Sequence, residues 1–173
     1  MRLVDPLIAE LEQESHATRR VLERVPDAHL AWRPHPKSFS LGQLALHVAT
    51  IPGSVTQLLS VDTVPEPPAF VQPAAGSAAE LLPAFAASLS QARHVLDGFD
   101  DAAMGRTWRL LAGGRELMSA PRGALLRAIM LNHWYHHRGQ LLVYLRMHDV
   151  PLPSVYGPTA DESPFAAAMG GAA

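Results

Sequence analysis

The sequence predicts an all-α protein, a four-helix bundle whose helices are joined by long loops. Alanine and leucine dominate the 173 residues while β-branched residues are few, which favours helix over strand. Apolar side chains recur at helical spacing over long segments, and proline- or glycine-rich stretches separate those segments. A chain of this length fits one domain with a sizeable core. We therefore expect residues 1–165 to form a single bundle domain and residues 166–173 to form a frayed tail.

The composition argues against several classes of protein. The formal net charge is −2 and the basic residues are scattered, so we expect neither a nucleic acid partner nor an anionic membrane surface. Cysteine is absent, which excludes disulfides, thiolate metal ligands and a cysteine nucleophile. No apolar run is long enough to span a bilayer and no signal-peptide pattern is found, so a cytoplasmic location is expected. The nine histidines are the compositional outlier.

Two helices are predicted in the N-terminal half. The pair Asp5-Pro6 supplies an N-cap and a proline at the first helical position, and Pro26 ends this helix. Ser40 and Gln43 have the spacing of a capping box and start the second helix. Within it, Pro52 cannot donate a hydrogen bond to the carbonyl four residues earlier, so we expect a kink or a break.

The chain between the second and third helices, residues 61–76, is rich in proline and alanine and is expected to be a surface loop. Ser77 and Glu80 repeat the capping-box spacing and predict the start of the third helix. Gly98 has the place of a C-terminal cap of that helix.

The segment before the last helix suggests a short hairpin, because apolar stretches flank Gly113-Gly114. The last helix is expected to begin at Ser119 to Pro121 and to be stopped by Pro151. It is apolar on more than one side, which places it at the centre of the fold or in a subunit interface.

Two histidines mark this last helix as the candidate functional element. At about 100° per residue, His133 and His137 lie one turn apart on the apolar face, and imidazoles at that spacing can reach one metal ion. Gln140 follows one turn later on the same face, where it could orient a ligand or contact a substrate. His136 lies about 60° from His133, at the edge of the stripe, and is a less favourably directed orienting group or substitute ligand.

A third histidine faces the predicted core from the second helix. His47 shares its face with Leu44, Ile51 and Leu58. Three imidazoles on two helices leave a coordination position open, as catalytic zinc requires, and imidazole also suits nickel, iron and copper. The simpler alternative is that all three are hydrogen-bonded core side chains without a metal. No part in the site is assigned to His16, His29, His35 or His94.

The chain resembles the DinB-like (YfiT-type) superfamily of metal-dependent proteins. The matching motifs, which together span nearly the whole chain, are Trp32-Arg33-Pro34, Phe39-Ser40-Leu41-Gly42-Gln43 followed by His47, His133-x-x-x-His137-Arg138-Gly139-Gln140, and Pro153-Ser154-Val155-Tyr156-Gly157-Pro158 with Asp161. The resemblance implies a four-helix bundle, a divalent metal (Zn, Ni or Fe) held by His47, His133 and His137, and a homodimer.

The resemblance also suggests an enzyme that joins a low-molecular-weight thiol to an electrophilic small-molecule substrate, because coordination to a metal deprotonates a thiol. Two alternatives stay open: a metal-dependent hydrolase, and a non-catalytic, metal-stabilised dimer with a stress-related role. The sequence identifies no general base. The inner helix faces carry no acidic residue in our mapping, which disfavours a mechanism with two carboxylates.

Overall fold

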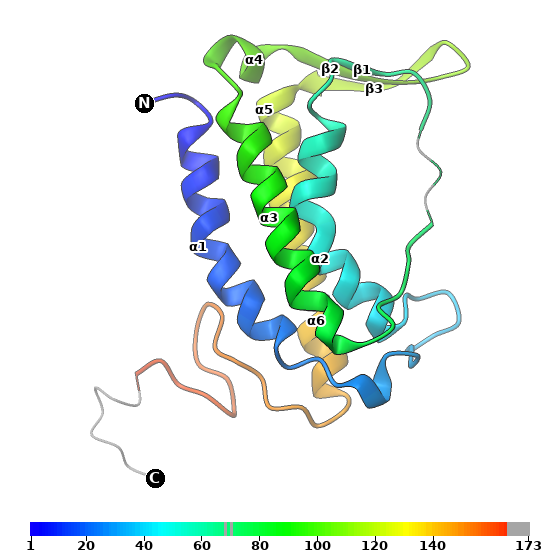
Figure 1. The fold of residues 1–173 in the computed structure, drawn as a ribbon, viewed down its shortest axis with the longest axis vertical. Coiled ribbons are helices and arrows are strands. Elements are labelled where there is room, and N and C mark those ends of the chain that lie inside the picture. The colour runs from blue at the N-terminus through cyan, green and yellow to red at the C-terminus, as the bar shows by residue number, and fades with distance from the viewer. Residues whose placement is uncertain (68, 70, 166–173) are drawn as a thin grey trace.

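The computed structural model of the chain describes residues 1–67, 69 and 71–165, so the expected tail of residues 166–173 lies outside the described residues. Long helices run alongside one another and dominate the molecule (Figure 1). They are α1 (Asp5–Leu22), α2 (Leu41–Leu58), α3 (Leu81–Asp97) and a last helix built from α5 (Arg122–Leu125), the π-helical segment η3 (Leu126–Asn132) and α6 (His133–Arg146). The prediction of a mainly helical chain is confirmed.

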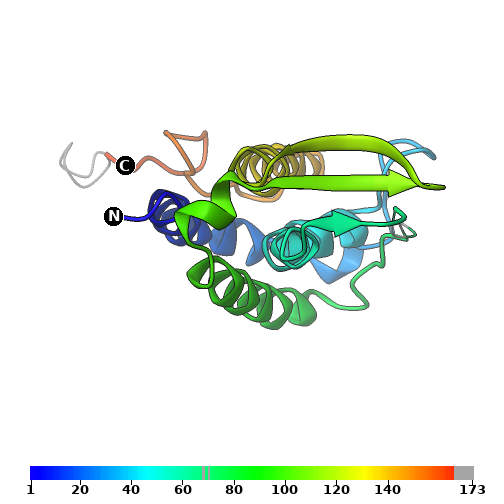
Figure 2. The same ribbon diagram turned by 90° about the horizontal axis from the view of Figure 1, so that it is seen from above.

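A small three-stranded sheet crosses one end of the helices, so the all-α prediction is confirmed only in part (Figure 2). The predicted hairpin is confirmed: β2 (Thr107–Ala112) pairs antiparallel with β3 (Arg115–Pro121), and both glycines of the turn, Gly113 and Gly114, have positive φ. Strand β1 (Thr63–Val64) comes from the expected loop and pairs in parallel with β2. A short helix, α4 (Asp101–Gly105), precedes the hairpin.

Capping by a serine and a glutamine explains where α2 begins, but the corresponding prediction for α3 fails. The capping box at the start of α2 is confirmed, since Gln43 N donates to Ser40 Oγ at 3.2 Å and Ser40 N donates to Gln43 Oε1 at 2.9 Å. The second predicted box is wrong. Ser77 precedes a short 3₁₀ turn, η2 (Ala78–Glu80), without capping it, and the Glu80 carboxylate accepts from Gly76 N instead.

Three further helix signals have a different effect in the structure from the one predicted. Asp5 lies inside α1 rather than at its cap, and its carboxylate accepts from the backbone and side chain of Arg2. Pro52 does not break α2, which is assigned as one helix. The last helix ends at Arg146, before Pro151, because Asp149 adopts a left-handed conformation with φ 56°.

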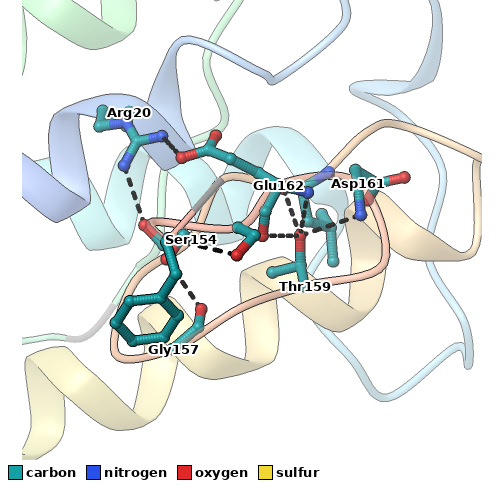
Figure 3. A network of polar contacts seen from close by, with 9 residues as sticks. Arg20, Ser154, Gly157, Thr159, Asp161 and Glu162 are labelled. Atoms are coloured by element: carbon teal, nitrogen blue, oxygen red, sulfur yellow. Dashed lines mark hydrogen bonds and ion pairs between the residues drawn. The ribbon is translucent and has the colours of Figure 1, made fainter. Parts of the chain in front are cut away.

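The segment after α6 is tied to α1 by polar contacts (Figure 3). Arg20 of α1 donates to the carbonyl of Ser154 at 2.9 Å and forms an ion pair with Glu162. Within the segment, Thr159 Oγ1 accepts from the backbone amides of Asp161 and Glu162. These contacts give a stretch without regular secondary structure a defined path across the helices.

The core lies between the long helices and fixes how α2 and α6 face each other. Trp134 of α6 is fully buried, and its indole nitrogen donates to the carbonyl of Val48 of α2 at 2.9 Å. Trp134 and Val48 directly follow His133 and His47 in the sequence. The buried bond therefore sets the register at which the two histidine-bearing helices meet. Among the described residues, no helix combines the length and apolarity needed to cross a membrane.

Candidate metal centre

Three half-buried histidines converge from two helices. His47 lies on α2, and His133 and His137 lie one turn apart on α6. One ring nitrogen from each lies within 4.8 Å of the others, and the Nε2 atoms of His133 and His137 are 2.9 Å apart. Two nitrogen ligands at about 2.0–2.1 Å from one ion lie roughly 3 Å apart. The spacing therefore matches what a shared metal ion requires.

The π-helical segment η3 ends immediately before His133 and affects its ring. The backbone amide of His133 donates to the carbonyl of Ala128, five residues earlier, as well as to Met130. The carbonyl of Ile129, four residues earlier, forms a hydrogen bond with the His133 side chain. The interruption of the α-helical pattern thus brings a backbone acceptor to the ring, and π-bulges of this kind are frequent at functional sites.

Glutamines contact the other two rings. His137 Nδ1 lies 2.9 Å from Oε1 of Gln140, so the ring donates and the amide oxygen accepts. The side chain of Gln72, from the segment between β1 and η2, hydrogen-bonds to His47. A hydrogen bond from one ring nitrogen to an acceptor fixes the tautomer and leaves the other nitrogen free to bind a metal. Each of the three rings therefore has one orienting partner.

Burial keeps the three rings neutral at physiological pH. It is the main cause that lowers the pKa of His47, His133 and His137, and for His47 the value falls to about 4. The neighbouring imidazoles lower the pKa of His47 further, while the hydrogen bond to Gln72 opposes the shift. Metal binding requires neutral imidazole, so protons compete little for this site near pH 7.

The donor set fits a divalent cation. A neutral ring has one N–H, and His137 directs it to Gln140 while the ring of His133 contacts the Ile129 carbonyl. With those protons so placed, the two facing Nε2 atoms both present lone pairs at 2.9 Å, an arrangement that a cation between them would stabilise. Phe39 supplies an apolar wall, with its ring centroid 5.7 Å from that of His47. These residues could hold a metal ion.

The remaining sequence candidates lie outside this group. His136 is exposed, and although its ring centroid is 4.9 Å from that of His137, it is not one of the three convergent side chains. His16 and His94 are exposed, as expected. His29 stacks on His148 with the ring centroids 4.0 Å apart, and His35 accepts a hydrogen bond from Lys37 N.

Two features of the site region escaped the sequence analysis. Gln72 lies in a segment that shows no periodicity, so only the fold brings it to His47. The statement that no acidic residue faces the interior is wrong. Glu14 of α1 is buried and pairs with the buried guanidinium of Arg138 at 2.6 Å. Glu14 is not part of the three-histidine group, which contains no carboxylate among the described residues.

A family model described as the DinB superfamily matches residues 10–141, a span that contains all three histidines. The chain belongs to the DinB superfamily. One relative is the uncharacterized protein YrdA of Bacillus subtilis (strain 168), which is 26% identical over 166 residues. The matched region covers 92% of this chain and 91% of YrdA.

Solved DinB-like structures share the fold of this superfamily member. A DinB-like protein from Bacillus cereus ATCC 10987 superposes with a TM-score of 0.64 at 22% identity, over 86% of this chain and 94% of that one. The DinB-like protein YjoA from Bacillus subtilis gives a TM-score of 0.65 at 19% identity, over 87% and 97% of the two chains. At these identities the structures support the fold and say nothing of a reaction.

Proposed function

We propose that this DinB-superfamily chain is a four-helix-bundle protein that binds a divalent metal through His47, His133 and His137. One observation carries the proposal: three ring nitrogens on two helices lie within 4.8 Å of one another. The orienting contacts to Ile129, Gln140 and Gln72 support it, because such partners are typical of metal-binding histidines. Imidazole ligands suit zinc, nickel and iron alike.

The chemistry that fits this donor set best is the transfer of a low-molecular-weight thiol to an electrophilic small molecule. A divalent ion held by neutral ligands keeps its full positive charge and favours the deprotonated form of a bound thiol. The sulfur would form a bond to the electrophilic atom, whose leaving group departs with the bonding electron pair. The chain contains no cysteine, so the thiol has to come from a co-substrate.

The residues around the histidines would orient the ligands and shape the site. Gln140 and Gln72 would hold the His137 and His47 rings, and Phe39 would exclude water from one side of the group. The absence of a carboxylate from the three-histidine group, within the described part of the chain, suits a reaction whose nucleophile needs no separate general base.

Elemental analysis tests the metal proposal. The protein would be purified without a histidine tag, loaded with zinc, nickel or iron in turn, and freed of excess metal. We expect a single bound ion per chain in the wild type and none in His133→Ala, with helical content unchanged because the core is large without the metal. His94→Ala, an exposed histidine, is the matched control and should bind as the wild type does. Full occupancy in His133→Ala would refute the ligand assignment.

A thiol-depletion assay tests the reaction. Metal-loaded protein would be mixed with a panel of cellular thiols and electrophilic acceptors, and the loss of free thiol would be followed with and without His47→Ala. Turnover that needs His47 would support thiol transfer. Turnover of an ester without any thiol would support the hydrolase instead, and no turnover of either kind would favour the non-catalytic, metal-stabilised protein.

A homodimer is part of the same proposal. Val143 and Met147 lie one turn apart at the end of the last helix and expose 60% and 57% of their surface. Exposed apolar side chains at this spacing suit a helix that packs against a second copy. Light scattering during gel filtration tests this, and a monomeric mass at micromolar concentration would contradict it.

A further inference from the structure

We infer that Gln72 is a positioning residue for His47, so that metal binding and the docking of residues 71–76 on α2 stabilise each other. This inference deepens the proposed metal-binding function and rests on it. It concerns residues 71–76, which precede η2 and α3 and lie beside the start of α2 (Figure 1).

Backbone and side-chain contacts dock this segment on the first turn of α2. Gln43, whose oxygen belongs to the capping box, donates from Nε2 to the carbonyl of Gln72 at 3.0 Å. Ala75 N donates to the carbonyl of Gly42 at 3.3 Å, and Ala75 is buried. The carbonyl of Ala75 lies 3.2 Å from where a Cβ of Gly42 would be, so glycine at this position permits the close approach. The segment is therefore held in a defined position on α2, about one helical turn before His47.

The Gln72 side chain is oriented to accept a hydrogen bond. Its Nε2 donates to the carbonyl of Pro73 at 3.1 Å, which directs the amide nitrogen toward its own backbone. With the amide nitrogen turned to Pro73, the amide oxygen is the atom of Gln72 that accepts the hydrogen bond from the His47 ring. The Gln72 oxygen thus accepts a hydrogen bond from the one N–H of the neutral His47 ring. The other ring nitrogen keeps its lone pair and is available to a metal ion.

Gln72 differs from the other two orienting partners in its place in the chain. Ile129 and Gln140 lie on the same helix as the histidines they contact, four residues before His133 and three after His137. Gln72 lies 25 residues after His47 (72 − 47), outside any helix. The orientation of His47 consequently depends on the segment being docked, whereas the orientation of the other two rings depends only on their own helix.

Thermodynamic linkage makes this dependence reciprocal. If the docked segment raises the metal affinity by orienting His47, then the metal must stabilise the docked segment by the same factor. Replacing a partner that orients a metal ligand typically lowers metal affinity by roughly 10–100-fold. We expect Gln72→Ala to weaken Zn²⁺ binding by that factor and Gln72→Glu, which keeps an acceptor oxygen, to restore most of the affinity.

The test is a competition titration of Zn²⁺ against a chromophoric chelator, with the Co²⁺ absorption spectrum as a second readout of ligand geometry. The matched control is Gln91→Ala, which removes an exposed glutamine of α3 that contacts Gln57 and should bind as the wild type does. Hydrogen exchange supplies an independent measurement: Zn²⁺ should slow exchange at the Ala75 amide in the wild type and not in Gln72→Ala.

The outcomes separate this inference from the proposed function. If the wild type binds no Zn²⁺, or His133→Ala binds as well as the wild type does, the metal-binding function fails and this inference fails with it. If the wild type binds and His133→Ala does not, but Gln72→Ala keeps wild-type affinity and spectrum and the Ala75 amide is insensitive to metal, only the role of Gln72 is overturned.

Discussion

The indole nitrogen of Trp134 donates a 2.9 Å hydrogen bond to the carbonyl of Val48 in the buried contact between α6 and α2. In a regular α-helix this carbonyl would accept a hydrogen bond from the amide of residue 52. Pro52 has no N–H and cannot donate that bond. The amide of Gly53 does not replace the missing donor, since it donates to Ser88 Oγ at 2.8 Å. The tryptophan therefore satisfies a carbonyl that the proline leaves free, and α2 continues through Pro52.

Replacing Trp134 by Phe should destabilise the protein by about 2–3 kcal/mol, because a buried carbonyl loses its donor and the smaller ring leaves space. Zn²⁺ should also bind more weakly, since the bond sets the register between the helices that carry His47 and His133. Chemical denaturation and the chelator competition measure the two effects. Unchanged stability would mean that the Val48 carbonyl finds another partner.

A double-mutant cycle isolates the link to the proline. Pro52→Ala supplies an amide N–H that can bond to Val48 within the helix. In that background Trp134→Phe should cost less, with an interaction energy of about 1 kcal/mol. Strictly additive effects would show that the tryptophan and the proline act independently.

The histidine pair of the last helix could be predicted from spacing because α6 is regular from His133 onward. Two residues one turn apart stay on one face whatever precedes them, so the unforeseen π-helical segment η3 did not disturb the argument. His47 could be placed on the inner face of α2 for the same reason. That α2 and α6 would bring these faces together was an expectation from the packing of a helical bundle, and the geometry of the three rings required the fold.

Apart from η3, the main features that the sequence did not predict depend on residues far apart in the chain. Strand β1 exists only because β2 lies beside it, as two residues have too little periodicity to indicate a strand. Gln72 reaches His47 by tertiary docking. Arg138 pairs with Glu14, which is 124 residues away in the chain. Local patterns carry no information on such pairs.

Acidification should destabilise the metal-free protein between about pH 6.5 and pH 4. The pKa of His47 falls from 6.5 in the unfolded chain to about 4 in the folded protein, mainly through burial. Between those values the unfolded chain binds more protons, so lowering the pH favours unfolding, and above pH 6.5 this histidine has no effect. Because the ring is only partly buried and solvent screens it, the loss attributable to His47 should be well below the roughly 3.4 kcal/mol that the full shift would give.

The measurement is urea denaturation of the metal-free protein at several pH values. His47→Gln should flatten the dependence in this window, and His16→Ala, an exposed control, should not. The lowest pH has to stay near 4.5, because carboxylates such as Glu10, whose pKa is lowered by a hydrogen bond from Arg127, add their own dependence below that value. A slope that His47→Gln leaves unchanged would assign the effect to other groups.

Removing one partner of the buried pair of Glu14 and Arg138 should destabilise the protein more than removing both partners. Arg138 is 2% exposed and also donates to Thr18 at 3.0 Å, and Tyr156 contacts both members of the pair. Glu14→Ala leaves an uncompensated buried cation and should cost about 3–5 kcal/mol. The double variant Glu14→Leu with Arg138→Met removes both charges and should recover most of that loss in chemical denaturation.

Replacing either of two glycines by alanine should change the stability of the protein, but in opposite directions. A Cβ on Gly53 would lie 2.9 Å from the carbonyl oxygen of Ser88, so Gly53→Ala must push α2 away from α3. We expect a loss of about 1–3 kcal/mol. Gly139 lies inside α6 with nothing within 4 Å of its Cβ position, so Gly139→Ala should stabilise the protein by about 0.5–1 kcal/mol through helix propensity alone.

The same two glycine variants also test whether the contact between α2 and α3 is coupled to the metal centre. Gly53 lies less than two turns after His47 on the same helix, so a shift of α2 should weaken Zn²⁺ binding as well as stability. Gly139 lies two residues after His137 but points away from packed neighbours, and its replacement should leave the affinity unchanged. Thermal denaturation with and without Zn²⁺ reports both quantities. Equal metal-induced stabilisation in Gly53→Ala and the wild type would show that the centre tolerates movement of α2, because the stabilisation depends directly on affinity.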